Sequence, residues 1–218
     1  MIIAVITQIN LVSVQLIYTT IGNCGTDVFF FGLAMHTCGQ FEILRNDLTE
    51  FGMIGDGIQL RRSLHILIKR HKHLINLSQQ LDDSFNGILL MQLFLSSLVI
   101  VVLGIQIIIG VKAGNTLVFL RLLFSFVVLM VQLFLYCYAG DYLSTSNEIL
   151  VDSIYKCPWY NLTKNLEKDL LFMMMRARVK FYITAGKFYS MDIENFKNVF
   201  KASMSYISVL LVMLNLDE

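Results

Sequence analysis

Four charge-free apolar segments, separated by stretches rich in charged residues, dominate the chain. They cover residues 1–26, 87–111, 122–140 and 202–216. The middle two are long enough to cross a bilayer core as α-helices, and we expect half-buried turns to extend the last one at its N-terminal end. Strands of a membrane barrel would alternate polar and apolar residues instead of forming such blocks. The pattern therefore predicts an all-α, polytopic membrane helical bundle with four membrane helices.

The charged stretches between these segments also carry apolar residues near helical spacing, at Leu60 to Leu81 and at Leu162 to Lys180. We expect the membrane helices to project beyond the bilayer and to pack there as helical extensions, although amphipathic helices lying flat on the lipid fit nearly as well. The predicted organisation is a single membrane domain, 1–218, with a first span at 1–45, a cytoplasmic helical loop at 46–86, a second span at 87–113, a third span at 116–147, a cytoplasmic segment at 148–190 and a last span at 191–216.

The segment from Phe181 to Leu214 predicts a helix that starts polar and then runs apolar almost to the end of the sequence. Hydroxyl and amide groups are spread through its charge-free part, at Ser203, Ser205, Tyr206, Ser208 and Asn215. Contact of such groups with lipid is unfavourable in free energy, whereas contact with water is not. Their presence therefore favours a helix that borders a pore or a polar seam. The alternative is a peripheral membrane helix whose serines bond back to their own carbonyls.

Composition places the chain among integral membrane proteins: 56% of the 218 residues are hydrophobic and 15% are charged, and the mean hydropathy is +0.65. The four cysteines share neither spacing nor a loop, so we expect packing residues and neither disulfides nor a zinc site. A net charge of +1 without a basic aromatic patch gives no sign of a nucleic-acid partner. Because no nucleophile stands beside a base, we expect no enzyme and no cofactor.

The distribution of Lys and Arg predicts the orientation in the membrane. Most of the 17 basic residues lie in 42–86 and 144–190, whereas the connection 112–121 holds only Lys112 and Arg121. The positive-inside rule then places both long segments in the cytoplasm and the C-terminus outside. Glycosylation sequons at Asn76 and Asn161 should stay unmodified. Met1 would lie outside, which suggests part of a longer protein.

The C-terminal part of the chain carries a run of motifs: residues 184–188 (Thr-Ala-Gly-Lys-Phe), Phe196 and residues 201–206 (Lys-Ala-Ser-Met-Ser-Tyr). Together they resemble the final helix of the insect odorant receptors. The inner half of the family's fourth helix is similar to residues 27–33, His36 and residues 40–44 of this chain. The base of its sixth helix is similar to residues 136–141, and its third intracellular loop is similar to Tyr155 and residues 158–160. The resemblance covers the whole chain through the order of these motifs.

The resemblance implies helices four to seven of a seven-helix receptor, with the seventh split near Ala185 and Ile193 and helices one to three missing. It implies an odorant-gated, non-selective cation channel of the plasma membrane, in which an odorant-binding subunit pairs with a co-receptor subunit in a heterotetramer. The cytoplasmic helix ends would form an anchor domain between subunits. Alternatives are a non-conducting membrane scaffold or assembly modulator, and a gustatory-receptor-like channel subunit.

For the pore we expect the face that carries Tyr206, Val209 and Met213, because spacings of three and four align them on one side of a helix. The resemblance places Val209 and Met213 at the gate, where apolar rings close a pore by making its water column unfavourable. Packing against lipid or a neighbouring helix is the alternative. The family often has a glutamine where this chain has Val212. The related gustatory receptors favour that glutamine together with a Thr-Tyr signature, whereas this chain has Ser205-Tyr206 and no glutamine, which favours an odorant over a gustatory receptor.

For a small volatile ligand the outer parts of two spans supply apolar and aromatic candidates. They are Val14, Tyr18 and Ile21 on the first span, and Phe119, Leu122, Leu123 and Phe126 on the third. Such a lining binds weakly polar molecules through dispersion and desolvation. Simple packing of aromatic residues is the more frequent reason for such a stripe.

Ionisable groups within the apolar segments are expected to be paired or hydrated. We expect structural hydrogen bonds for Asp27 and Asp141, and for His36 as a partner of a nearby acid. His65, His71 and His73 lie in a basic stretch, where a solvated face is more frequent than a metal site.

Overall fold

The computed structural model describes residues 2–51, 57–112 and 116–216; within these ranges the side chains of 2–11, 16, 108, 111–112, 161, 210–211 and 213–216 are outside the description. The described elements are α1 (Ile2–Glu50), α2 (Gly57–Lys112), α3 (Thr116–Lys156), the 3-10 turn η1 (Trp159–Asn161), α4 (Lys164–Ala177), β1 (Thr184–Ala185), β2 (Tyr189–Ser190) and α5 (Ile193–Leu216). The all-α prediction is confirmed.

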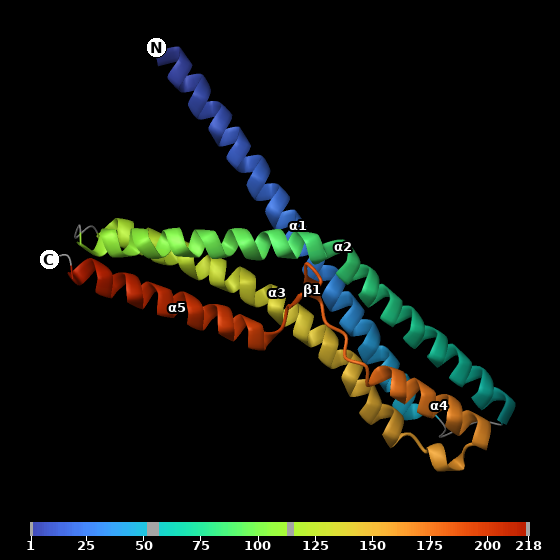
Figure 1. Cartoon of the computed structure of the whole chain (residues 1–218). Helices are drawn as coiled ribbons and strands as arrows, with labels where there is room; N and C mark the ends of the chain where they lie inside the picture. Colours follow the sequence, from blue (N-terminus) through green and yellow to red (C-terminus); the bar gives the residue numbers. More distant parts are fainter. Residues whose placement is uncertain (1, 52–56, 113–115, 217–218) are drawn as a thin grey trace.

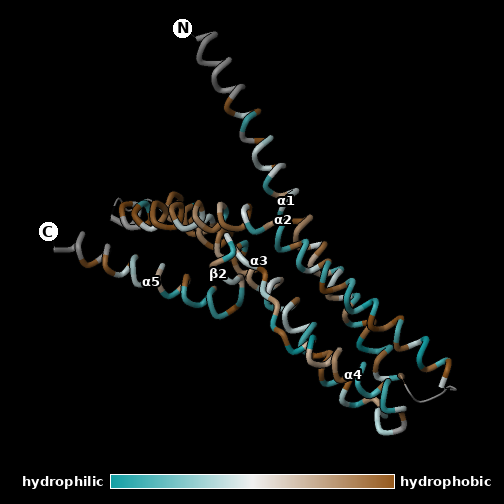
Figure 2. Tube along the Cα trace, turned by 45° about the vertical axis from the view of Figure 1, so that its right-hand side comes forward, coloured by the Kyte–Doolittle hydropathy of each residue, from teal (hydrophilic) through white to brown (hydrophobic). Residues whose placement is uncertain are grey.

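The long helices continue without a break from apolar into polar sequence. Among the described residues, α2 and α3 each contain a stretch long and apolar enough to cross a membrane. Apolar colour gathers where the second half of α2 lies beside the first half of α3, and polar colour increases toward α4 (Figure 2). A membrane crossing by α1 and α5 stays a prediction.

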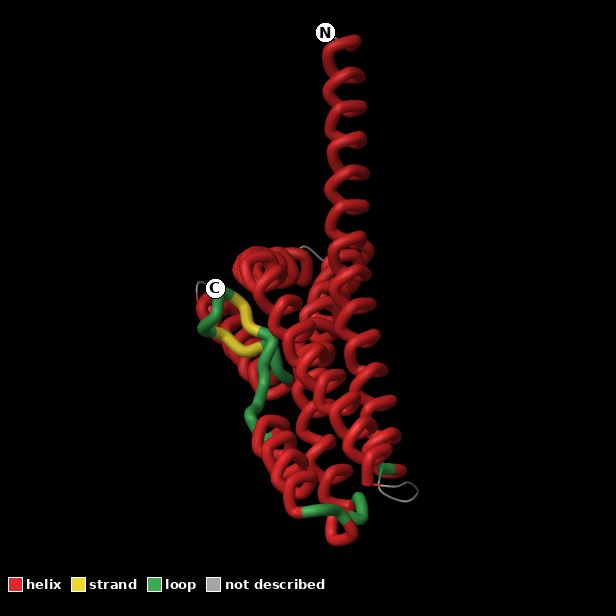
Figure 3. The backbone as a smooth tube through the Cα atoms, turned by 90° about the vertical axis from the view of Figure 1, so that its right-hand side faces the viewer, coloured by secondary structure: helices red, strands yellow, loops and turns green. Residues whose placement is uncertain are grey.

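The helices form two connected bundles that share α2 and α3 (Figure 1). The second half of α1, the first half of α2, the second half of α3 and α4 make the polar bundle. The second half of α2, the first half of α3 and α5 make the apolar bundle. The N-terminal half of α1 stands apart from both (Figures 1 and 3).

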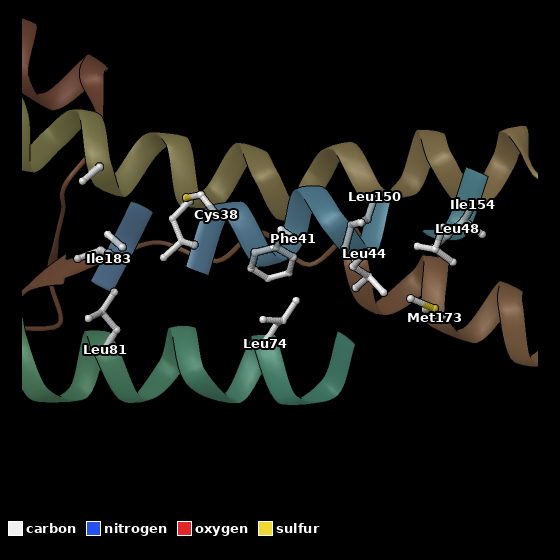
Figure 4. Packing of buried hydrophobic residues seen from close by; sticks show 14 of the residues in the cluster. Cys38, Phe41, Leu44, Leu48, Leu74, Leu81, Leu150, Ile154, Met173 and Ile183 are labelled. Carbon is white, nitrogen blue, oxygen red and sulfur yellow. The ribbon is translucent and has the colours of Figure 1, made fainter. Parts of the chain in front are cut away.

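The core of the polar bundle lies around α1. Phe41, Leu44 and Leu48 are fully buried at helical spacing. Figure 4 shows Phe41 facing Leu74 of α2, and Leu44 beside Leu150 of α3. These side chains belong to one buried cluster that draws on α1, α2, α3 and α4. Burial of a large aliphatic or aromatic side chain stabilises a soluble fold by about 1.5–3 kcal/mol, and the same packing holds the polar extensions together here.

The expectation of a helix from Phe181 onward is wrong for its first residues. Two short antiparallel strands pair Thr184 with Ser190 and Ala185 with Tyr189, and α5 begins only at Ile193. Gly186 and Lys187 between the strands have φ of 64° and 67°. This left-handed conformation is incompatible with a continuing right-handed helix, so the chain reverses at this point.

Candidate functional site

The last helix, α5, is the candidate pore element, and residues just before and inside its first turn fix its start. The backbone N–H of Asn195 donates to Asp192 Oδ1 at 2.7 Å. Ser190 Oγ donates to Asp192 Oδ2 at 2.7 Å, and the Asn195 amide donates to the Ser190 carbonyl at 2.9 Å. A carboxylate in front of a helix satisfies free N–H groups and complements the helix dipole. The helix therefore starts directly after the hairpin.

One face of α5 packs against α2 and α3. The ring of Phe196 lies 5.4 Å from that of Phe134 of α3. Ile207 meets α2 at Gly104, where an added Cβ would lie 3.1 Å from Ile207 Cγ1. Ser203, between them in helical spacing, is half-buried. The bundle thus holds α5 along the line of residues 196, 203 and 207.

Two of the three predicted gate residues lie outside this packed face. Tyr206 is 44% exposed and Val209 is 51% exposed, whereas the side chain of Met213 lies outside the described residues. Spacings of three and four place 206, 209 and 213 on one side of the helix. The chain itself leaves this side uncovered at Tyr206 and Val209.

The serine hydroxyls of α5 are partly satisfied within the helix. Ser203 Oγ donates to the Val199 carbonyl at 2.8 Å, and Ser208 Oγ donates to the Met204 carbonyl at 2.9 Å. This is the back-bonding that the peripheral-helix alternative requires. Hydroxyls at 203 and 208 therefore do not by themselves indicate water beside α5.

A polar cluster between α2 and the hairpin, here called the hairpin latch, joins α5 to the bundle. Asp82 accepts hydrogen bonds from the backbone N–H of Thr184 at 2.6 Å, from Thr184 Oγ1 at 2.8 Å and from Lys187 Nζ at 2.9 Å. Lys187 also contacts Asp83, and the N–H of Gly186 donates to the Asn86 carbonyl at 2.9 Å. The hydrogen bonds to Asp83 and then Asp82 raise the pKa of the Lys187 ammonium.

The latch was not predicted from the sequence, although residues 184–188 were noted for their family resemblance. Its acid and its hairpin are 102 residues apart in the chain. The available signal was the Asp82-Asp83 pair at the end of the basic stretch, directly before the charge-free segment.

A second polar group joins α1 to α3 near the point where the two bundles meet. Gln132 Nε2 donates to Asp27 Oδ2 at 2.6 Å, and the Tyr136 hydroxyl donates to Asp27 Oδ1. The expectation of a structural hydrogen bond is confirmed for Asp27. It is wrong for Asp141 and His36, which make no hydrogen bond or ion pair among the described residues.

The predicted ligand-pocket residues lie in two separate places. Val14, Tyr18 and Ile21 are exposed on the N-terminal half of α1 that stands apart (Figure 1). Phe126 is buried on α3 with Ile100 and Leu103 of α2, and Leu122 packs beside this cluster. Phe119 is half-buried and Leu123 is exposed. The described chain does not bring the α1 group and the α3 group together.

His71 is buried, which corrects the expectation of a solvated side chain; His65 and His73 are exposed as expected. His71 occupies the core position of α2 in the series Leu64, Leu67, His71, Leu74, where spacings of three and four face the bundle. Its Nε2 lies 3.3 Å from Asn147 Oδ1 of α3. Burial is the main cause that lowers the pKa of His71. The hydrogen bond with Asn147 raises this pKa, and the nearby positive charge of Arg176 lowers it further.

Three of the four cysteines are buried, as expected for residues that fill space in the packed core. Cys38, Cys137 and Cys157 are buried and free, whereas Cys24 is free and exposed on α1. Among the described residues no group of three or more His, Cys, Asp or Glu side chains could hold a metal ion.

Comparisons with known proteins agree with this architecture. The family model described as "7tm Odorant receptor" matches residues 2–204. Odorant receptor 13a of Drosophila melanogaster is 28% identical over 193 residues, which are 80% of this chain and 45% of that protein. The odorant receptor coreceptor of Ooceraea biroi is 23% identical over 155 residues, 69% of this chain and 31% of that protein. The chain spans less than half the length of these relatives.

The fold also resembles solved structures. The insect olfactory receptor OR5 from Machilis hrabei superposes with a TM-score of 0.73 at 14% identity, over 91% of this chain and 50% of that one. The structure of the same receptor in complex with eugenol gives a TM-score of 0.69 at 13% identity, over 86% of this chain and 48% of that one. At this identity the likeness concerns the fold alone.

Proposed function

The chain belongs to the odorant receptor family, and from this premise we propose that it is a subunit of an odorant-gated, non-selective cation channel that works with a co-receptor subunit. The observation that carries the proposal is the family match over residues 2–204, nearly the whole chain. The membrane helices and the likeness to a solved insect receptor are in keeping with it.

In this proposal α5 lines the ion path and Tyr206, Val209 and Met213 form the gate. Support comes from the arrangement of α5, whose line of Phe196, Ser203 and Ile207 faces the bundle while Tyr206 and Val209 are left exposed. Apolar side chains from several subunits would close the path by excluding water, and a small outward movement of α5 would admit hydrated cations.

The proposed ligand is a small, weakly polar volatile. The α3 group, Phe119, Leu122, Leu123 and Phe126, offers apolar and aromatic surface beside α2. Val14, Tyr18 and Ile21 are exposed and open to contact with other segments of a receptor. Apolar walls favour such ligands through desolvation and dispersion. One solved relative in fold was determined in complex with eugenol.

We further propose a plasma-membrane heterotetramer with the polar bundle in the cytoplasm. The basic residues gather in the polar bundle and its connections, as the positive-inside rule requires. Similarity to odorant receptor coreceptors as well as to odorant receptors suits subunits that assemble with one another.

Cysteine accessibility tests the proposed pore. Tyr206→Cys, Val209→Cys and Met213→Cys are introduced separately into a receptor that contains this chain, co-expressed with a co-receptor, and odorant-evoked current is recorded. We expect charged, water-soluble thiol reagents to alter the current at these positions. Ile207→Cys, on the packed face, is the matched control and should respond little. No response at all three positions in open and closed channels would contradict the pore assignment.

A non-conducting assembly modulator is the second candidate. It is favoured by the back-bonded hydroxyls of Ser203 and Ser208, which do not need a wet surface. For this candidate we expect co-purification with the co-receptor and no odorant-evoked current. For the channel proposal we expect both co-purification and an odorant-evoked current.

A further inference from the structure

A cleft of about 410 Å³ lies between α2 and α4 in the polar bundle. Small-molecule sites have volumes of about 300–1,000 Å³, so the cleft is large enough for a ligand. It is separate from α5 and from the predicted odorant pocket. The lining residues are Ile68, His71, Lys72, Ile75, Asn76, Asp169, Phe172, Met173 and Arg176.

The inner wall of this α2–α4 cleft presents a hydrogen-bond acceptor. Asn147 Nδ2 donates to the Ala177 carbonyl at 3.0 Å, so the amide oxygen of Asn147 faces His71. An oxygen accepts, and Nε2 of His71 must therefore carry the hydrogen, which leaves Nδ1 as a bare lone pair. Buried side-chain nitrogen and oxygen atoms of the described residues all have partners. Nδ1 makes no hydrogen bond among them, so it is open to the cleft that His71 lines.

The rim of the cleft is cationic. Lys72 and Arg176 stand against one acid, Asp169. Among the described residues, Arg176 makes no ion pair and no side-chain hydrogen bond, although its charge acts on His71. Arg176 also lines a neighbouring cleft of about 70 Å³. A guanidinium with unused donors can bind an oxyanion through two parallel hydrogen bonds.

The remaining walls are apolar. Ile68 and Ile75 come from α2, and Phe172 and Met173 come from α4. Phe172 is 75% exposed, so its ring is accessible to a molecule in the cleft. A ligand with an apolar body would cover this surface.

The place of the cleft along α2 decides where such a ligand comes from. Lys72 precedes the charge-free stretch that begins at Gly87 by a distance of about 22 Å along the helix, at about 1.5 Å per residue. The polar layer of a bilayer is only about 5–8 Å thick on each side. A lipid that stays in the membrane would not reach the cleft, so the ligand must arrive from water.

We propose that the α2–α4 cleft binds a water-soluble amphiphilic oxyanion, with a carboxylate or phosphate head on Arg176 and Lys72 and an apolar body against Phe172 and Ile68. A hydroxyl on the ligand donates to Nδ1 of His71. The site would give the subunit a second ligand, distinct in chemistry from an uncharged volatile.

Binding of phenyl phosphate to the full chain in phosphatidylcholine nanodiscs tests the proposal by isothermal titration calorimetry. We expect Arg176→Gln to weaken binding by about tenfold or more, because a charge-assisted pair is lost. The matched control is Arg178→Gln, an exposed cation two residues further on that lines a different cleft, and it should bind within about twofold of the parent. Equal weakening by the two variants would show a general charge effect and overturn the proposal.

Three further arms separate the parts of the ligand and its source. Phe172→Ala should weaken phenyl phosphate but not inorganic phosphate, because Phe172 contacts only the apolar body; its side chain is exposed, so the fold is retained. Benzyl alcohol, which lacks the anion, should bind much more weakly than phenyl phosphate, and equal binding would overturn the proposal. Displacement of phenyl phosphate by phosphatidylserine in the nanodisc would overturn the water-soluble source.

Discussion

Gly140 of α3 lies directly against the main chain of Met191, so that a Cβ at position 140 would be 2.2 Å from the Met191 carbonyl oxygen. Met191 precedes α5, and its own N–H donates to the Ile183 carbonyl at 2.8 Å. The contact is between backbones, which cannot rotate away as side chains do. Glycine at 140 therefore sets how closely the chain entering α5 approaches α3.

Gly140→Ala should destabilise the protein by about 1–3 kcal/mol or more, since the Met191 segment must move to admit a methyl group. Thermal unfolding in nanodiscs, followed by circular dichroism, measures the change. Gly39→Ala is the matched control, because an added Cβ on this helical glycine meets nothing within 4 Å. We expect Gly39→Ala to be neutral or to stabilise by about 0.5–1 kcal/mol. Equal melting temperatures for both variants would refute the close contact.

The hairpin latch should depend on Asp82 far more than on Asp83. Asp82 is 7% exposed and accepts three hydrogen bonds, whereas the Asp83 side chain is 67% exposed. Asp82→Ala leaves the Thr184 N–H and the Lys187 ammonium without this partner and should cost about 2 kcal/mol or more. Asp83→Ala should cost less than about 1 kcal/mol. Denaturant unfolding measures both, and a cost at Asp83 as large as that at Asp82 would contradict the assignment.

The helices were predictable because their signals are local. Apolar residues at spacings of three and four predicted a helix at 162–180, and α4 spans Lys164–Ala177. The membrane fold and the family resemblance were confirmed for the same reason, since both rest on ordered patterns in the sequence.

The latch was not predictable in this way, whereas the hairpin left a local signal that the helix prediction overlooked. Phe181 to Ser190 is rich in aromatic and β-branched residues on both sides of Gly186, a composition that favours two short strands joined by a turn. The Asp82–Thr184 bonds join distant segments and leave no local pattern. His71 was misjudged for another reason: its basic neighbours suggested water, although its spacing from Leu67 and Leu74 already placed it on the apolar face.

The bond between Tyr136 and Asp27 should contribute to stability where α1 leaves the bundles. Tyr136→Phe removes a donor to a half-buried carboxylate and should cost about 1.5–3 kcal/mol. Tyr138→Phe is the matched control, because the Tyr138 ring stacks on Tyr142 and its hydroxyl bonds to no described residue. A double-mutant cycle with Asp27→Ala, which removes the acceptor, isolates the pair. A coupling energy near zero would show that the bond contributes nothing.

Stability should fall in mild acid because of His71. Its pKa is lowered from the ordinary value of 6.5 in the folded state, chiefly by burial, so the unfolded chain binds a proton first. The contribution of the buried, neutral His71 to the free energy of unfolding is complete above pH 6.5. It is lost as the pH falls through 6.5 toward the pKa of His71 in the folded state. Each unit between the two pKa values corresponds to about 1.4 kcal/mol. Arg176, Lys72 and Asp169 line the cleft beside His71 and are present in every variant compared.

Unfolding free energies of the parent, His71→Gln and the exposed His73→Gln, measured between about pH 7.5 and pH 5, isolate this contribution. The parent and His73→Gln should lose stability with the same slope, because both keep the buried imidazole. His71→Gln should lose less over this interval, since a glutamine does not titrate and its amide can still donate toward Asn147. Parallel slopes for all three proteins would mean that the proton taken up on unfolding belongs to another group.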